Sequence, residues 1–197
     1  MKQKSILWLL GSLFLFSFMA TSCDEEQGVV NPYDNWQERN ELYFDSIANV
    51  ANKNLGEAPG QWKKMKSRRL SSSNPGLPDD YVYAQIQKVG YGASPEYDSD
   101  TIVCHYRGRL ISGYVFDETF DTELDTEVDV PADMLTLGGV IDGWSAAMDE
   151  MRVGDRWMIY VPYAMGYGIL NKEGIPGYST LIFDVQLVDV RPRKGMH

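Results

Sequence analysis

Apolar and polar residues alternate along four stretches after residue 80, which is the pattern of half-buried β-strands. In the first stretch, residues 81–88, Val82, Ala84 and Ile86 share one face. Glycine-containing turns separate the stretches, so the pattern predicts an antiparallel sheet. The faces of the other three stretches are Ile102, Cys104, Tyr106, Gly108 and Leu110; Trp157, Ile159 and Val161; and Leu181, Phe183, Val185 and Leu187.

A helical pattern interrupts this alternation over residues 142–151 and ends before Gly154. Its apolar residues recur three or four positions apart, as Trp144, Ala147, Met148 and Met151. One short helix against one antiparallel sheet is an α+β fold.

A second helix is expected at the N-terminal side of the sheet, over residues 31–51. Asn31-Pro32 suits a helix start, and Asp34 with Gln37 suits a capping box. The apolar face can pack on its own domain or on a second copy or partner, and the sequence leaves both alternatives open. It is formed by Trp36, Tyr43, Ile47 and Val50, with Phe44 and Ala51 beside them.

Residues 53–76 are rich in glycine, proline and serine, which predicts a linker with one possible structured piece. A basic cluster lies within it, formed by Lys63, Lys64, Lys66, Arg68 and Arg69. Such a cluster can bind an anionic lipid or another polyanion. In a chain this acidic, neutralisation by carboxylates of the same chain is the preferred interpretation.

The first 22 residues have the layout of a secretory signal peptide, with Lys2 and Lys4 before an apolar run of 15 residues. Residues 20–23 read ATSC and resemble a bacterial lipobox, which implies lipidation of Cys23. More than one acyl chain, such as palmitate, would anchor the protein stably to a membrane. Ordinary signal cleavage is the alternative. The acidic residues 24–26 resemble a surface-export tag, and a solvated tether explains them equally well.

Charge and cysteine content narrow the possible functions. The formal net charge is −10, and removal of residues 1–22 leaves 175 residues with a charge of −12. Nucleic acid is therefore not an expected partner. The two cysteines exclude a disulfide framework and a cysteine-based zinc site. With Cys23 lipidated, Cys104 is expected to be a buried, reduced thiol.

Familiar catalytic signatures are absent from the sequence, including a G-x-S-x-G elbow and a phosphate-binding loop. His105 and His197 are the two histidines, too few for a histidine metal site, and His105 lies in a strand pattern that favours a structural role. Residues 117–129 hold seven carboxylates without the spacing of a calcium loop, so we expect a solvated acidic loop.

A series of short motifs follows in a fixed order. Residues 105–110 read HYRGRL, followed by GxxFD at 113–117, VIxGW at 140–144, MxxGD at 151–155, PYA at 162–164, YG at 167–168, IP at 175–176 and TLIFDVxL at 180–187. Together they resemble the FKBP-type peptidyl-prolyl cis/trans isomerases, over residues 77–191. The resemblance implies an antiparallel sheet wrapped around a short helix, with an apolar pocket between the two.

The same resemblance implies the site. Tyr106, Asp117 and Tyr167 would be the catalytic residues, with the Tyr167 hydroxyl donating to a substrate carbonyl. The substrate-binding residues would be Phe116, Val140, Ile141, Trp144, Ile175 and Phe183. No cofactor or metal is implied. Two segments depart from the family pattern: Val128 is a loose counterpart of a further pocket aromatic, and residues 169–174 are particular to this chain.

The expected organisation is a lipoprotein signal peptide at 1–22, a tether and helix at 23–52, a linker at 53–76, an isomerase domain at 77–192 and a tail at 193–197. The expected function is isomerisation of X-Pro bonds in exported proteins; the alternative is a non-catalytic proline-peptide binding module or chaperone. Expected partners are proline-containing polypeptides, a macrolide ligand and, through the lipid, the outer membrane of a Gram-negative envelope, facing the periplasm or the surface.

Overall fold

The computed structural model describes residues 31–71, 73–119 and 133–192. Its strands are β1 Trp62–Lys66, β2 Tyr81–Lys88, β3 Thr101–Arg109, β4 Val115–Glu118, β5 Asp133–Thr136, β6 Arg156–Val161 and β7 Leu181–Arg191. The helices are α1 Trp36–Ala51 and α2 Asp142–Met148, with 3₁₀ turns at Pro78–Asp80, Leu137–Gly139 and Tyr163–Met165. The predicted signal peptide, Cys23, Val128 and the 193–197 tail lie outside the described residues.

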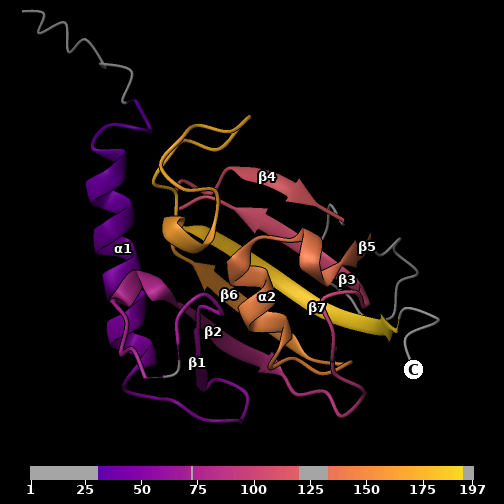
Figure 1. Ribbon diagram of the computed structural model, residues 1–197. Helices are drawn as coiled ribbons and strands as arrows, with labels where there is room; N and C mark the ends of the chain where they lie inside the picture. The colour runs from indigo at the N-terminus through magenta and orange to yellow at the C-terminus, as the bar shows by residue number, and fades with distance from the viewer. Residues whose placement is uncertain (1–30, 72, 120–132, 193–197) are drawn as a thin grey trace, which may run out of the picture. The chain divides into compact units, whose positions relative to one another are not determined.

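The described strands form one antiparallel sheet in the order β1-β2-β6-β7-β3-β4, and β5 also pairs with β3 (Figure 1). Helix α2 lies across one face of this sheet. Trp144, Ala147 and Met148 of α2 are buried with Ile159 and Leu187 of the sheet in one core cluster. The predicted α+β fold is confirmed.

Four strands follow the predicted alternation, and β2 has the predicted bounds. Cys104, on β3, is a free buried cysteine whose pKa is raised to about 12 by burial, as expected for an inert thiol. Helix α2 ends at Met148, three residues earlier than predicted, although Met151 is still buried. No helix among the described residues has the length and apolarity needed to cross a membrane.

Helix α1 begins at Trp36, so the predicted start at Asn31 and the capping box of Asp34 with Gln37 are wrong. Residues 32–35 form a turn instead, and Asn35 takes a left-handed conformation with φ of 50°. No side chain caps the helix there.

The apolar face of helix α1 was expected to pack either on its own domain or on a second copy or partner. In the structure it packs on its own domain. Its buried face is Trp36, Asn40, Phe44, Ala48 and Ala51, whereas Val50 is exposed, contrary to the predicted face. Phe44 lies against Tyr83, with ring centroids 5.7 Å apart. Side chains alternate across β2, so α1 covers the face opposite to α2 at this edge of the sheet.

Hydrogen bonds attach the start of α1 to the segment before β7, one of them from the Thr180 hydroxyl to the Asn40 carbonyl at 3.3 Å. The indole of Trp36 donates to the hydroxyl of Ser179 at 3.0 Å. The backbone N–H of Thr180 donates to Oδ1 of Asn40 at 2.8 Å. The N-terminal helix therefore supports the polypeptide that leads into the central strand.

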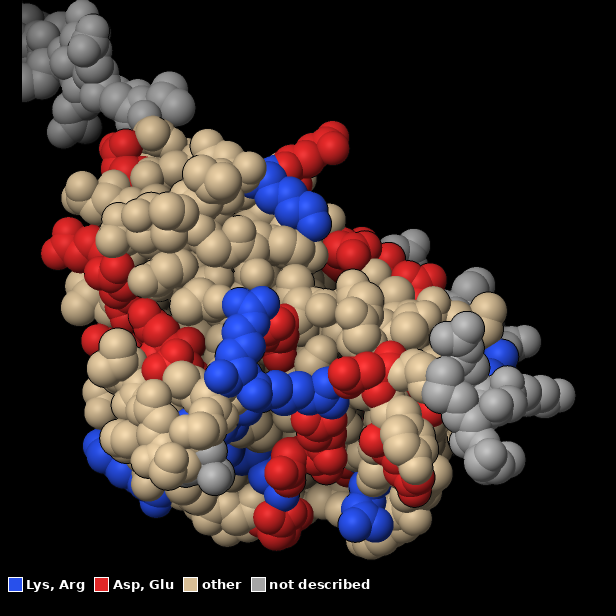
Figure 2. Space-filling view, viewed as in Figure 1, with Lys and Arg blue, Asp and Glu red and all other residues tan. Residues whose placement is uncertain are grey.

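Within the expected linker over 53–76, residues 62–66 are a structured piece, and they form β1 at the edge of the sheet, which the sequence did not identify as a strand. Its buried residues, Trp62 and Met65, are three positions apart, so strict alternation does not reveal the strand. Lys63, Arg68 and Arg69 of the basic cluster pair with carboxylates of the same chain, as preferred above, whereas Lys64 lies over the Tyr81 ring and Lys66 donates to backbone carbonyls. Arg69 pairs with Asp142 at 2.6 Å, and Arg68 pairs with Asp98 and Asp149. Figure 2 shows basic side chains lying against acidic ones in the middle of this face.

Candidate active site

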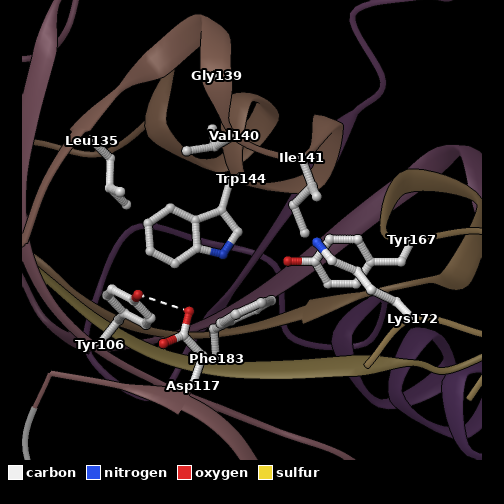
Figure 3. Close-up of a pocket in the computed structure, with 10 residues that line it drawn as sticks. All are labelled: Tyr106, Asp117, Leu135, Gly139, Val140, Ile141, Trp144, Tyr167, Lys172 and Phe183. Carbon is white, nitrogen blue, oxygen red and sulfur yellow. Dashed lines mark hydrogen bonds between the residues drawn. The ribbon is translucent and has the colours of Figure 1, made fainter. Parts of the chain in front are cut away.

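A cavity of about 210 Å³ lies between α2 and the sheet (Figure 3). Strands β3, β4, β5 and β7, the start of α2 and the loop after the Tyr163–Met165 turn all contribute to it. Its lining residues are Tyr106, Asp117, Leu135, Gly139, Val140, Ile141, Trp144, Tyr167, Lys172 and Phe183.

The indole of Trp144 forms the floor. Tyr106 meets it edge-to-face at 5.2 Å between centroids, and Phe183 meets it in the same way at 5.3 Å. Such pairs are favoured by the aromatic quadrupoles. Because Tyr106 and Phe183 come from β3 and β7, which pair directly, the sheet fixes both rings around the helix residue. The floor is therefore apolar and rigid.

One acidic group lies at the rim. The Tyr106 hydroxyl donates to Oδ2 of Asp117 at 2.9 Å, and Oδ2 of Asp133 lies 3.3 Å from the same hydroxyl. Burial, together with these two carboxylates, raises the pKa of Tyr106 well above its ordinary value. The phenol therefore stays protonated at neutral pH and keeps its role as donor to Asp117.

The residues that lead into α2 form the upper wall of the cavity. The carbonyl of Ile141 accepts the N–H groups of Trp144 at 2.9 Å and Ser145 at 3.1 Å, so the first turn of the helix fixes this peptide. Among the described residues, none accepts a hydrogen bond from the Ile141 N–H. Its side chain points into the cavity beside that of Val140 (Figure 3). The wall thus combines apolar surface with an available backbone donor.

Tyr167 closes the opposite side of the cavity. Gly168 has a φ of 78°, and its N–H donates to the Tyr163 carbonyl at 2.9 Å, so the chain turns directly after Tyr167. The Tyr167 hydroxyl points toward the middle of the site (Figure 3). The ammonium of Lys172 lies 3.8 Å from the centroid of the Tyr167 ring.

Two of the expected pocket residues do not line the cavity. Phe116 instead packs edge-to-face against Phe183, with centroids 5.5 Å apart. Gly108 leaves space for the rings of Phe116 and Phe183, since a Cβ at this position would lie 2.6 Å from the Phe116 ring. Ile175 is buried and lines a neighbouring hollow. The other seven expected catalytic and substrate-binding residues do meet at the cavity.

The sequence did not indicate Leu135, Gly139 and Lys172 as lining residues. Leu135 lies on β5, whose four residues follow the acidic stretch and carry no recognisable alternation. Lys172 lies in the segment that departs from the family pattern. No cluster of His, Cys, Asp and Glu among the described residues could hold a metal ion.

Comparison with known proteins identifies the domain. Residues 92–188 match the model of the FKBP-type peptidyl-prolyl cis-trans isomerases. The chain is 35% identical to the FKBP-type isomerase FkpA of Escherichia coli K12 over 130 residues, which are 66% of this chain and 43% of FkpA. It is 34% identical to the isomerase Mip of Coxiella burnetii over 134 residues, 65% of this chain and 55% of Mip.

The fold is likewise similar to a solved structure. The crystal structure of Escherichia coli FkpA superposes with a TM-score of 0.57 and 29% identity, covering 81% of this chain and 62% of that chain. The chain spans about half the length of the curated relatives it matches. Residues 92–188 therefore form a domain of the FKBP-type peptidyl-prolyl cis-trans isomerase family.

Proposed function

We propose that this protein is a peptidyl-prolyl cis/trans isomerase that assists the folding of exported proteins. The observation that carries the proposal is the apolar cavity floored by Trp144, with Asp117 at its rim and two hydrogen-bond donors, Tyr167 and the Ile141 N–H, on its walls. A prolyl ring fits such a floor, and the donors suit the carbonyl groups on either side of it.

The chemistry follows from the resonance of the peptide bond. Rotation about it faces a barrier of about 18–20 kcal/mol, because the bond has partial double-bond character. At the twisted transition state the resonance is lost and charge separation falls. An apolar, water-poor cavity therefore favours the twisted amide over the planar one, and this difference in binding is what lowers the barrier.

Each residue of the cavity has a separate role in the proposed reaction. The prolyl ring packs on Trp144 between Val140, Ile141 and Phe183. The Tyr167 hydroxyl and the Ile141 N–H donate to substrate carbonyls and hold one part of the chain while the ring turns. Tyr106 holds Asp117 at the rim, where the two act as the polar pair of the site. Shortening isomerisation from about 100 s to about 1 ms requires roughly 7 kcal/mol of differential binding.

We further propose that the protein works while anchored to the outer membrane by a lipid on Cys23, facing the periplasm or the cell surface. The signal-peptide layout and the ATSC sequence at 20–23 support this. A 36% identical relative over 125 residues is named outer membrane protein MIP of Legionella longbeachae. Metabolic labelling with radioactive palmitate tests the anchor, with Cys23→Ala expected to abolish incorporation.

A protease-coupled assay on a proline tetrapeptide tests the proposed activity. The purified full chain in detergent should accelerate the slow phase, and a macrolide of the type that binds this family should inhibit it by occupying the same cavity. Absence of acceleration at any protein concentration would overturn the catalytic proposal.

A non-catalytic proline-peptide binder or chaperone is the second candidate. Large apolar side chains are exposed at the start of β4, as Tyr114 and Val115, and in the loop after Tyr167, as Ile169 and Leu170. Exposed apolar surface of this kind suits unfolded clients. Suppression of client aggregation that survives both Tyr167→Phe and Asp117→Leu would favour this candidate.

A further inference from the structure

Two hollows meet at Lys172. The first is the cavity over Trp144, and the second, of about 420 Å³, has Tyr33, Tyr114 and Ile175 among its walls. Lys172 lines both. A polypeptide whose proline occupies the first hollow and whose chain continues into the second must therefore pass beside this lysine.

The backbone of Lys172 is held in place. Its N–H donates to the Ile175 carbonyl at 2.8 Å, and the Ile175 N–H donates back to the Lys172 carbonyl at 2.8 Å. The side chain of Asn171 accepts the N–H of Gly177 at 2.8 Å. These bonds close a small hairpin, so the lysine projects from a fixed position at the junction of the two hollows.

The ammonium group of Lys172 forms no ion pair with a carboxylate among the described residues. It reaches across the ring of Tyr167 toward Ile141 (Figure 3), at 3.8 Å from the ring centroid. None of the ion pairs among the described residues involves it. Asp117 lies at the other side of the cavity, where it accepts from Tyr106. Among the described residues, no carboxylate therefore pairs with the positive group on this wall of the cavity.

We infer that Lys172 is a specificity residue that selects client segments with a carboxylate within two residues of the proline, an inference that rests on the proposed function. Successive residues of an extended chain are about 3.3 Å apart, so a side chain this close to the bound ring is within reach of a lysine on the same cavity wall. An exposed ion pair of this type changes affinity by about two- to fivefold.

The test uses pairs of proline peptides that differ only in Glu against Gln, placed at each of the two positions on either side of the proline. The ratio of kcat/KM for Glu over Gln is measured with the full chain, with Lys172→Met and with Lys172→Glu. Lys53→Met serves as the charge-matched control, because Lys53 follows α1 and lines neither hollow.

The wild-type ratio should be about two- to fivefold in favour of Glu at one position or more. It should fall to about one in Lys172→Met, fall below one in Lys172→Glu and stay unchanged in Lys53→Met. Raising the ionic strength from about 0.01 M to about 1 M should remove the preference, since the Debye length falls from about 30 Å to about 3 Å. A wild-type ratio of one at every position, or a ratio that survives Lys172→Met, would overturn the inference.

Fluorescence anisotropy with labelled versions of the same peptides separates this inference from the proposed activity. If neither peptide is isomerised but the Glu peptide binds more tightly in a Lys172-dependent way, the catalytic proposal fails and the selectivity stands. If both peptides are isomerised with equal efficiency and bind equally, the activity stands and the selectivity fails.

Discussion

Tyr106 on β3 and Asp117 on β4 share a hydrogen bond of 2.9 Å at the rim of the cavity, and the same Tyr106 ring meets the indole of Trp144 edge-to-face. One side chain thus joins the polar rim of the site to its apolar floor. The register of the two strands, in which Gly108 lies opposite Asp117, places the carboxylate there.

Replacement of Asp117 by Leu should lower kcat/KM for proline peptides about tenfold, because the rim loses its carboxylate and the hydroxyl of Tyr106 keeps only the more distant Asp133 as acceptor. Tyr106→Phe, which removes the donor and keeps the ring, should have a smaller effect. The measurement is a protease-coupled assay, with urea unfolding to show that both variants stay folded. Equal activity of Asp117→Leu and wild type would exclude a role for this rim pair.

Gly108→Ala should destabilise the domain by about 1–3 kcal/mol, because the new methyl group would lie 2.6 Å from the Phe116 ring and 2.8 Å from the Phe183 ring. Displacement of Phe183 should also weaken macrolide binding. Chemical denaturation and a ligand titration measure the two effects. Gly139→Ala is the matched control for stability, since a Cβ there meets nothing within 4 Å.

Asn40→Ala should cost about 1–3 kcal/mol of unfolding free energy, since it leaves the buried N–H of Thr180 without its acceptor. Denaturant titration gives the value. Gln37→Ala, on the exposed side of the same helix, should change stability by about 0.5 kcal/mol or less. Similar losses in the two variants would mean that the attachment of α1 contributes nothing specific.

The raised pKa of Asp79 predicts that the stability of the fold depends on pH. Burial raises its pKa, and Asp45, Glu41 and Asp80 raise it further, whereas a hydrogen bond with Tyr163 lowers it. A carboxyl group whose pKa is higher in the folded state opposes folding as it ionises. The penalty is absent below the unfolded pKa and complete above the folded one.

Asp79→Asn should therefore be more stable than wild type at neutral pH, and its advantage should vanish as the pH falls below the ordinary range of an aspartate. Thermal unfolding across a pH series measures this difference. Asp34→Asn, at an exposed carboxylate, is the control. An advantage of Asp79→Asn that grows on acidification would contradict this explanation.

The long strands were predictable because apolar residues two positions apart form one fully buried face in each, most regularly in β6. The edge strand β1 was not, because its two buried residues are three positions apart. Strands β4 and β5 have four residues each and no fully buried position, so neither produces a detectable pattern. Their positions depend on pairing with β3, a long-range contact that local sequence does not encode.

The site was predictable where a motif carries the residue, as with Trp144 in VIxGW and Phe183 in TLIFDVxL. The motif does not say which aromatic residue faces the cavity, and Phe116 packs against Phe183 without lining it. Lys172 could not be found in this way, since its role depends on a hairpin closed by backbone hydrogen bonds with Ile175.

Direct measurement of cis/trans exchange tests the central claim most simply. A proline peptide is observed by NMR exchange spectroscopy with a catalytic amount of the full chain, and again with Trp144→Leu, which removes the aromatic floor. The uncatalysed exchange takes tens to hundreds of seconds. The account predicts that the protein brings the exchange into the range of milliseconds to seconds and that Trp144→Leu, shown to be folded by circular dichroism, loses at least about nine-tenths of this acceleration. An exchange rate unchanged by the wild-type protein, or fully retained in Trp144→Leu, would contradict it.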